Sequence, residues 1–238
     1  MYDNLIFDLY GTLIDIRTDE DSKAFWKKFS HYMRRQGVHY HWKDLQRAYK
    51  EVIRRQEQEE TPYEYPEIEI RDTFRILCLQ KGRICSEEKI EEIARAFRRI
   101  STCYVRLYPD TEESLKQFQA AGKKLYLLSN AQTVFTMPEL EALGLTSYLD
   151  GIFISSDRGC KKPDPAFMEQ LLEYYSLDRT RSVMIGNDVQ ADVGIANRVG
   201  MDSAYLHTNL SPKLEKEPDS TWASLNGKMS ELIPFLLK

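Results

Sequence analysis

The sequence lacks the features that would hold the chain in a membrane or direct it out of the cell. No run of apolar residues approaches the roughly 18 that a bilayer-spanning helix needs. The chain does not open with a basic stretch, an apolar region and a small-residue cleavage site, so it shows no sign of a secretion signal. We therefore predict a cytoplasmic protein that does not bind a membrane.

Cysteine pairs and an excess of positive charge are also missing. The four cysteines form no CxxC pair and stand at no zinc-finger spacing from a histidine, so we expect reduced thiols. A net charge of −4 gives no general attraction to nucleic acid, and we predict no nucleic-acid partner. Internal repeats and low-complexity tracts are absent as well, which leaves an ordinary globular composition.

The pattern of apolar residues divides the chain into two kinds of region. Between residues 18 and 105, four charged and aromatic stretches place apolar residues three and four apart, which predicts helices. After this region, short apolar runs alternate with helical stretches, and the first strand at the N-terminus reads in the same way. We predict an α/β fold, a Rossmann-like doubly wound parallel sheet over residues 1–17 and 106–238, with a helical insertion over 18–105.

Two features of the insertion have both structural and functional interpretations. Phe25, Trp26, Phe29 and Tyr32 recur at helical spacing, and we expect them to form the insertion's own core. The segment TPYEYPEIEI, residues 61–70, interrupts the helices with two prolines. It would either line the entrance to a site or simply cross from one helix to the next.

Polar residues follow each of the predicted parallel strands. They are Asp8 after the first strand, Ser129 and Asn130 after the second, the turn Lys161-Lys162-Pro163-Asp164-Pro165 after the third, and Asn187, Asp188 and Asp192 after the fourth. Singly, each has a structural explanation as a cap, as loop text or as a helix start with proline in its first turn. In open parallel sheets, however, ligands bind beyond the carboxyl ends of the strands. The four groups together therefore predict one shared functional pocket.

The stretches FDLYGTL, LLSN, KKPDP and IGNDVQADVGIANRVG resemble the four motifs of the haloacid dehalogenase-like hydrolase superfamily. The resemblance covers nearly the whole chain and implies that residues 18–105 form a helical cap domain over the α/β core. It implies that Asp8 is the nucleophile, that Ser129 with Asn130 holds the transferring group, and that Lys162 is the catalytic cation.

The resemblance also assigns the remaining polar residues of these motifs. Their implied roles are Gly11 and Thr12 in substrate binding, Tyr10 beside the nucleophile in catalysis, and Asp8, Tyr10, Asn187, Asp188 and Asp192 around a magnesium ion. Whether Asn187 or Asp188 touches the metal stays open. The implied partner is a small-molecule substrate, and the chain would act as a monomer or a homodimer.

These residue types suit an attack by a carboxylate. Asp8 would form a covalent ester that water later cleaves. Attack on a phosphate dianion brings two anions together, so a divalent ion, a hydroxyl and a lysine must hold the phosphate oxygens. When ionised, Asp8, Asp188 and Asp192 against Lys162 leave about two negative charges, which favours Mg²⁺ as cofactor.

Tyr10 does not fit the usual phosphatase pattern of the superfamily. Phosphatases of the superfamily carry a second aspartate two residues after the nucleophile, and Tyr10 stands in that place here. A phenol with a pKa of about 10 is a poor base at neutral pH, and losing an acid–base group costs on the order of 100- to 10,000-fold in rate. The sequence therefore predicts a phosphatase whose substrates have acidic leaving groups, such as aryl or acyl phosphates.

Two alternatives remain open. The D-x-Y-G-T pattern also resembles metal-independent 2-haloacid dehalogenases, which grip the substrate carboxylate with a cap arginine. Arg34 and Arg35 are candidates for that arginine, although RRQGV has the pattern of a helix end. The second alternative, of a different class, is a phosphate-binding or regulatory protein that keeps the fold and has lost turnover.

Overall fold

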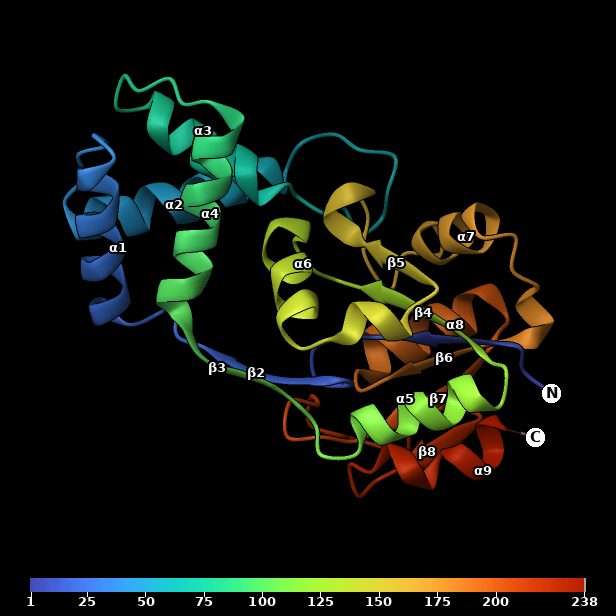
Figure 1. The fold of residues 1–238 in the computed structure, drawn as a ribbon. Coiled ribbons are helices and arrows are strands. Elements are labelled where there is room, and N and C mark those ends of the chain that lie inside the picture. The colour runs from blue at the N-terminus through green and yellow to red at the C-terminus, as the bar shows by residue number, and fades with distance from the viewer. Residues whose placement is uncertain (238) are drawn as a thin grey trace.

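A six-stranded parallel sheet forms the centre of the fold (Figure 1). The structure, a computed structural model, describes residues 1–237. In spatial order the strands are β5 (Gly151–Ile154), β4 (Lys124–Ser129), β1 (Asn4–Phe7), β6 (Ser182–Gly186), β7 (Asp202–Leu206) and β8 (Trp222–Ser224). Strand β1 therefore lies in the middle, with Leu5 paired to Leu125 on one side and to Val183 on the other.

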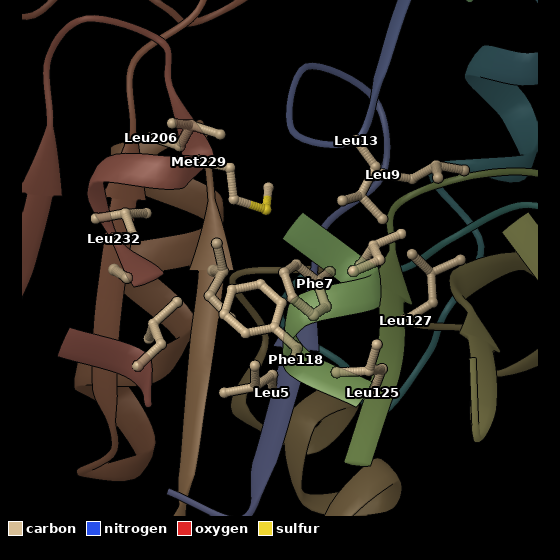
Figure 2. Close-up of a cluster of buried hydrophobic side chains, with 14 of the residues drawn as sticks. Leu5, Phe7, Leu9, Leu13, Phe118, Leu125, Leu127, Leu206, Met229 and Leu232 are labelled. Atoms are coloured by element: carbon tan, nitrogen blue, oxygen red, sulfur yellow. The ribbon is translucent and has the colours of Figure 1, made fainter. Parts of the chain in front are cut away.

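Helices cover both faces of this sheet, as predicted for a doubly wound α/β fold. They are α5 (Thr111–Ala120), α6 (Thr133–Ala142), α7 (Pro165–Tyr174), α8 (Gly194–Val199) and α9 (Ile233–Leu236). Leu5 and Phe7 of β1 are buried on one face against Phe118 of α5, as Figure 2 shows. Ile6 is buried on the other face in a second apolar cluster, with Phe167 of α7. The alternation along β1 thus produces two separate cores.

The four helices predicted between the strands are present. They are α1 (Lys23–Arg35), α2 (Trp42–Gln56), α3 (Ile70–Leu79) and α4 (Glu87–Ser101). Side chains cap three of them, because Ser22 accepts from Phe25 N, Glu69 accepts from Arg71 N and Ser86 accepts from Lys89 N. Phe25, Trp26 and Phe29 are buried in an apolar cluster of these helices, and Tyr32 packs against it, which confirms the prediction of an internal core.

Arg34 and Arg35 lie exposed in the last turn of α1, so the interpretation of this stretch as a helix end is confirmed. Basic side chains there offset the partial negative charge of the helix terminus.

An antiparallel ribbon joins the helices α1–α4 to the sheet (Figure 1). It consists of β2 (Ile14–Thr18) and β3 (Thr102–Leu107), which were not predicted as strands. The predicted domain boundaries, at 17/18 and 105/106, fall inside these two strands. The division into core and cap remains a prediction, and the ribbon is the segment that both halves share.

Within residues 1–237, no helix has the length and apolar character that a membrane crossing requires.

Candidate active site

The order of the strands brings the predicted site residues together. Strands β4, β1 and β6 are neighbours and parallel, so their carboxyl ends lie side by side at one edge. Asp8 follows β1 directly, and its backbone N–H donates to Ile185 O of β6 at 2.8 Å. Asn130 follows β4, and Asn187 follows β6. Side chains from three strand ends therefore face one region.

A pocket of about 190 Å³ opens at this edge of the sheet. Its lining comprises Asp8, Tyr10, Asn130, Lys162, Asn187, Asp188, Ala191, Asp192, Leu210 and Pro212. Seven of these ten are residues that the sequence assigned to the site. Of the other three assigned residues, Gly11 and Thr12 lie against the Asn187 side chain, and Ser129 is fully buried at the end of β4.

Lys162 occupies the middle of the charged cluster. Its Nζ lies 2.7 Å from Asp8 Oδ1, 2.8 Å from Asp192 Oδ1 and 2.7 Å from the Leu128 carbonyl. The side chain is only 1% exposed. Burial acts to lower the pKa of Lys162, but Asp192 and Asp8 outweigh it and raise the pKa above the ordinary value. Lys162 is therefore a permanently charged contact of Asp8.

The second carboxylate oxygen of Asp8, Oδ2, lies beside the turn of Gly11 and Thr12. Thr12 Oγ1 lies 3.1 Å from Asp8 Oδ2 and 3.2 Å from Asn187 Oδ1. Gly11 adopts a φ of +94°, and a Cβ there would stand 2.3 Å from Asn187 Nδ2. Only glycine provides both this backbone conformation and the space for Asn187.

The acidic fourth motif contains one half-buried and one fully buried carboxylate. Asp188 caps the π-helical turn Val189–Val193 by accepting from Gln190 N and Ala191 N with Oδ1. Among residues 1–237, no hydrogen bond reaches its Oδ2. Asp192 is buried, and its Oδ2 accepts from Asp188 N at 2.9 Å. Burial raises the pKa of Asp192, against the opposing effect of Lys162.

Ser129 and Asn130 differ in how they are engaged. The buried Ser129 hydroxyl makes no hydrogen bond to any group within the described chain. Both polar atoms of the Asn130 side chain are engaged, because its Nδ2 donates to Lys162 O at 2.9 Å and its Oδ1 accepts from Lys162 N at 2.7 Å. Asn130 thus fixes the loop that carries Lys162, and Ser129 supplies a hydroxyl without a protein partner.

The residues present fit a magnesium ion. Mg²⁺ needs one or two carboxylates and takes its other ligands from substrate and water. Asp8 and Asp188 both line the pocket, and Asp188 Oδ2 is not engaged by the described residues. No larger metal-binding group of three or more His, Cys, Asp or Glu side chains occurs within residues 1–237.

The hydroxyl of Tyr10 is engaged outside the charged cluster. It donates to Glu139 Oε2 at 2.5 Å and lies 3.1 Å from Thr136 Oγ1. Burial and the charge of Glu139 raise the pKa of Tyr10 far above its ordinary value near 10, although Arg98 opposes this. The phenol therefore stays protonated at neutral pH and cannot serve as a base.

The partners of Tyr10 were not predicted from the sequence. Arg98 of α4 forms two hydrogen bonds to Glu139 of α6, from Nε at 2.7 Å and from Nη2 at 3.2 Å. This buried ion pair links the inserted helices to the α/β half. The two residues are 41 positions apart on separate helices, so no local pattern in the sequence reveals the contact.

Residues 61–69 of the insertion pack directly on the loop before Lys162. Lys161 N donates to Tyr65 O at 3.0 Å, and Glu67 N donates to Gly159 O at 3.0 Å. The Glu67 carboxylate accepts from Ser155 Oγ at 2.7 Å, and burial raises the pKa of Glu67 despite this bond. The segment is thus more than a connection between helices, because it ties the insertion to the loop that positions Lys162.

Comparison with known proteins identifies the family. A model of the family described as haloacid dehalogenase-like hydrolase matches residues 2–200. The chain therefore belongs to the haloacid dehalogenase-like hydrolases, and the resemblance of its four motifs is confirmed.

Curated relatives carry phosphatase names. The chain is 33% identical over 100 residues to ribulose-1,5-bisphosphate 5-phosphatase of Halopiger xanaduensis, covering 42% of each chain. It is 30% identical over 133 residues to phosphoserine phosphatase of Thermus thermophilus, covering 56% of this chain and 53% of the relative. The chain spans about half the length of the curated relatives it matches.

Among solved structures, a 2-haloacid dehalogenase from Pseudomonas syringae pv. tomato superposes with a TM-score of 0.66 at 17% identity, over 100% of this chain and 98% of that one. At this level of identity the likeness shows the fold alone, and the fold hosts more than one chemistry.

Proposed function

We propose that this chain is a magnesium-dependent phosphatase that acts on a small organic phosphate with an acidic leaving group. The observation that carries the proposal is the Asp8 carboxylate, held by Lys162 at 2.7 Å and Thr12 at 3.1 Å in a pocket that also contains Asp188. The phosphatase names of the curated relatives support the same reaction class.

In this mechanism Asp8 attacks the phosphorus atom, and the bond between phosphorus and the leaving oxygen breaks as the aspartyl–phosphate bond forms. Water then attacks phosphorus and regenerates the carboxylate. Lys162 stabilises the charge on the phosphate oxygens, and the unpartnered Ser129 hydroxyl suits one of them. Asp8 and Asp188, with Asn187 beside them, would hold Mg²⁺, which neutralises the phosphate charge when bound.

The preference for acidic leaving groups follows from Tyr10. Its hydroxyl is bonded to Glu139 and its pKa is raised, so Tyr10 is a weak proton donor to a departing alkoxide. A phenolate or a carboxylate leaves without protonation, whereas an alkoxide does not.

A 2-haloacid dehalogenase is the second candidate, because Tyr10 stands in the D-x-Y-G-T pattern. The acidic pocket argues against it. When ionised, the pocket's three aspartates outnumber Lys162, and a haloacid would add its own carboxylate to this excess of negative charge.

A substrate panel separates these candidates. Nitrophenyl phosphate, an acyl phosphate, an alkyl phosphate and a short 2-haloacid are offered with Mg²⁺ and with EDTA, and released phosphate or halide is measured. We expect phosphate release that requires Mg²⁺ and is lost in Asp8→Asn, while Asp21→Asn at a 95% exposed aspartate retains full activity. Halide release in EDTA would establish the dehalogenase. Binding of phosphate analogues without multiple turnover would indicate a protein that has lost catalysis.

A further inference from the structure

A second cavity, of about 420 Å³, borders the Asp8 pocket. The two share Tyr10, Asn130 and Leu210 in their linings, so they are adjacent in space. A volume of this size is ample for a small organic group, since ligand sites span roughly 300–1,000 Å³. If the chain is a phosphatase as proposed, the phosphate lies at Asp8 and the leaving group enters this second cavity.

Most of the cavity wall is apolar or aromatic. The apolar and aromatic residues of its lining are Tyr10, Ile16, Tyr49, Ile70, Ala131, Phe135 and Leu210. Such a wall stabilises a ring or a branched carbon skeleton by burying its surface.

Arg98 is the one cationic side chain in the described lining, and its charge is already matched. Its Nε and Nη2 bond Glu139, and the two side chains are only 16% and 11% exposed. The guanidinium also stands 5.4 Å from the Tyr10 ring centroid and 5.5 Å from that of Phe135. Moving Arg98 to a substrate anion would leave the Glu139 carboxylate buried without its partner.

Glu20 is the charge that remains. It lines the cavity beside Arg98 and Tyr49, and burial raises its pKa while Arg98 opposes the shift. Its charge also contributes to the raised pKa of Tyr49, so the two side chains interact. With Arg98 and Glu139 cancelling each other, the cavity is neutral when Glu20 is protonated and negative when it is ionised.

We infer that this cavity selects phosphate esters with an uncharged, largely apolar leaving group, such as a phenol, and that the ionised carboxylate of Glu20 excludes leaving groups carrying a carboxylate or a second phosphate. The inference rests on the proposed function and narrows its substrate class. Tyr10 requires the leaving group to be acidic, and Glu20 requires it to carry no negative charge of its own. A phenol meets both requirements.

A pair of aryl phosphates of equal size tests this. One is phenyl phosphate with a carboxamide at position 4, and the other carries a carboxylate at that position. The two esters differ by one charge, and kcat/KM is measured for each. We expect the wild-type chain to favour the carboxamide by about tenfold or more, and Glu20→Gln to reduce that ratio several-fold. Comparing the ratio between variants cancels the intrinsic reactivity of the two esters. Glu59→Gln, at an exposed glutamate of the same insertion, should leave the ratio unchanged.

Preference of the wild-type chain for the carboxylate, or a ratio unaltered in Glu20→Gln, overturns the inference. Binding of the two esters to Asp8→Asn, measured by calorimetry, reports the charge preference without turnover. If no phosphate ester is hydrolysed, the proposed function fails, and the calorimetry still decides the inference. Tighter binding of the carboxamide, lost in the double variant with Glu20→Gln, supports it, and equal affinities refute it.

Discussion

The Tyr10 hydroxyl donates to Glu139 Oε2 at 2.5 Å, and the same carboxylate receives two hydrogen bonds from Arg98. The side chain that follows the predicted nucleophile by two positions is therefore part of the contact between the two halves of the chain. This contact gives a physical reason for a tyrosine in that place. A shorter acidic side chain would not reach Glu139 and would add a like charge near it.

Replacing Tyr10 by aspartate should change which esters are cleaved. An aspartate there can protonate a departing alkoxide, so we expect kcat/KM for an alkyl phosphate to rise by about 100-fold, with a much smaller change for nitrophenyl phosphate. Steady-state kinetics on both esters measure this. Tyr10→Phe is the matched control, because it removes the bond to Glu139 without adding an acid. An equal gain in both variants would contradict the role given to Tyr10.

Any side chain at Gly11 should lower both stability and activity. A Cβ would stand 2.3 Å from Asn187 Nδ2 in a backbone with φ of +94°, so Gly11→Ala should cost roughly 3 kcal/mol of stability through strain and overpacking. Displacement of Asn187, and through it of Thr12 and Asp8, should lower kcat/KM by about 100-fold.

Gly122 provides the comparison for this substitution. It also has a positive φ, of +75°, but its Cβ would meet nothing within 4 Å among the described residues. Gly122→Ala should cost only about 1 kcal/mol and leave activity intact. Urea unfolding and kinetics of the two variants give the result, and equal losses would show that backbone strain alone is responsible.

Lys162 should be needed for both stability and turnover. Lys162→Met keeps the length of the side chain but leaves Asp8 and Asp192 buried without a cation, at a cost of roughly 3–5 kcal/mol. Turnover should fall by at least about 100-fold. Lys161→Met is the control, since the hydrogen bond of Lys161 to Tyr65 O is made by its backbone N–H, which methionine retains. A Lys162→Met enzyme with normal kcat would exclude a catalytic cation at this position.

Glu67 should make stability depend on pH. Its pKa is raised in the folded chain, chiefly by burial, so folding favours its protonated form. Its contribution is fully present below the unfolded pKa of about 4.3 and is lost as pH rises through the higher folded value. Glutamine keeps an acceptor for Ile68 N and can donate to Ser155 Oγ, which bonds Ala131 O in turn.

We therefore compare the melting temperatures of Glu67→Gln and the wild-type chain. The value for the variant minus the wild-type value should increase between pH 5 and pH 8. A change of about 1 kcal/mol in the free energy of unfolding corresponds to a few degrees. Thermal unfolding followed by circular dichroism measures the difference. Glu59→Gln, at an exposed position, serves as reference. A difference that decreases with pH would show that the sign is wrong and that the carboxylate is stabilised in its charged form.

Much of the fold could be predicted because it follows from local patterns. Short apolar runs that end in polar turns predicted β1, β4, β5 and β6, and apolar residues at helical spacing predicted α1–α4. The ribbon of β2 and β3 was missed because it is short, antiparallel and only partly buried, so its apolar alternation covers few residues.

The order of residues along the chain determined which groups follow each strand, and parallel topology then placed Asp8, Lys162 and Asp188 at one pocket. Tertiary structure alone decided the Tyr10–Glu139–Arg98 contact, the packing of residues 61–69 on the Lys162 loop, and the cavity that Glu20 faces. Periodicity reports which face of one element is buried. It carries no information on which side chains of two distant elements meet, because that depends on how the elements pack.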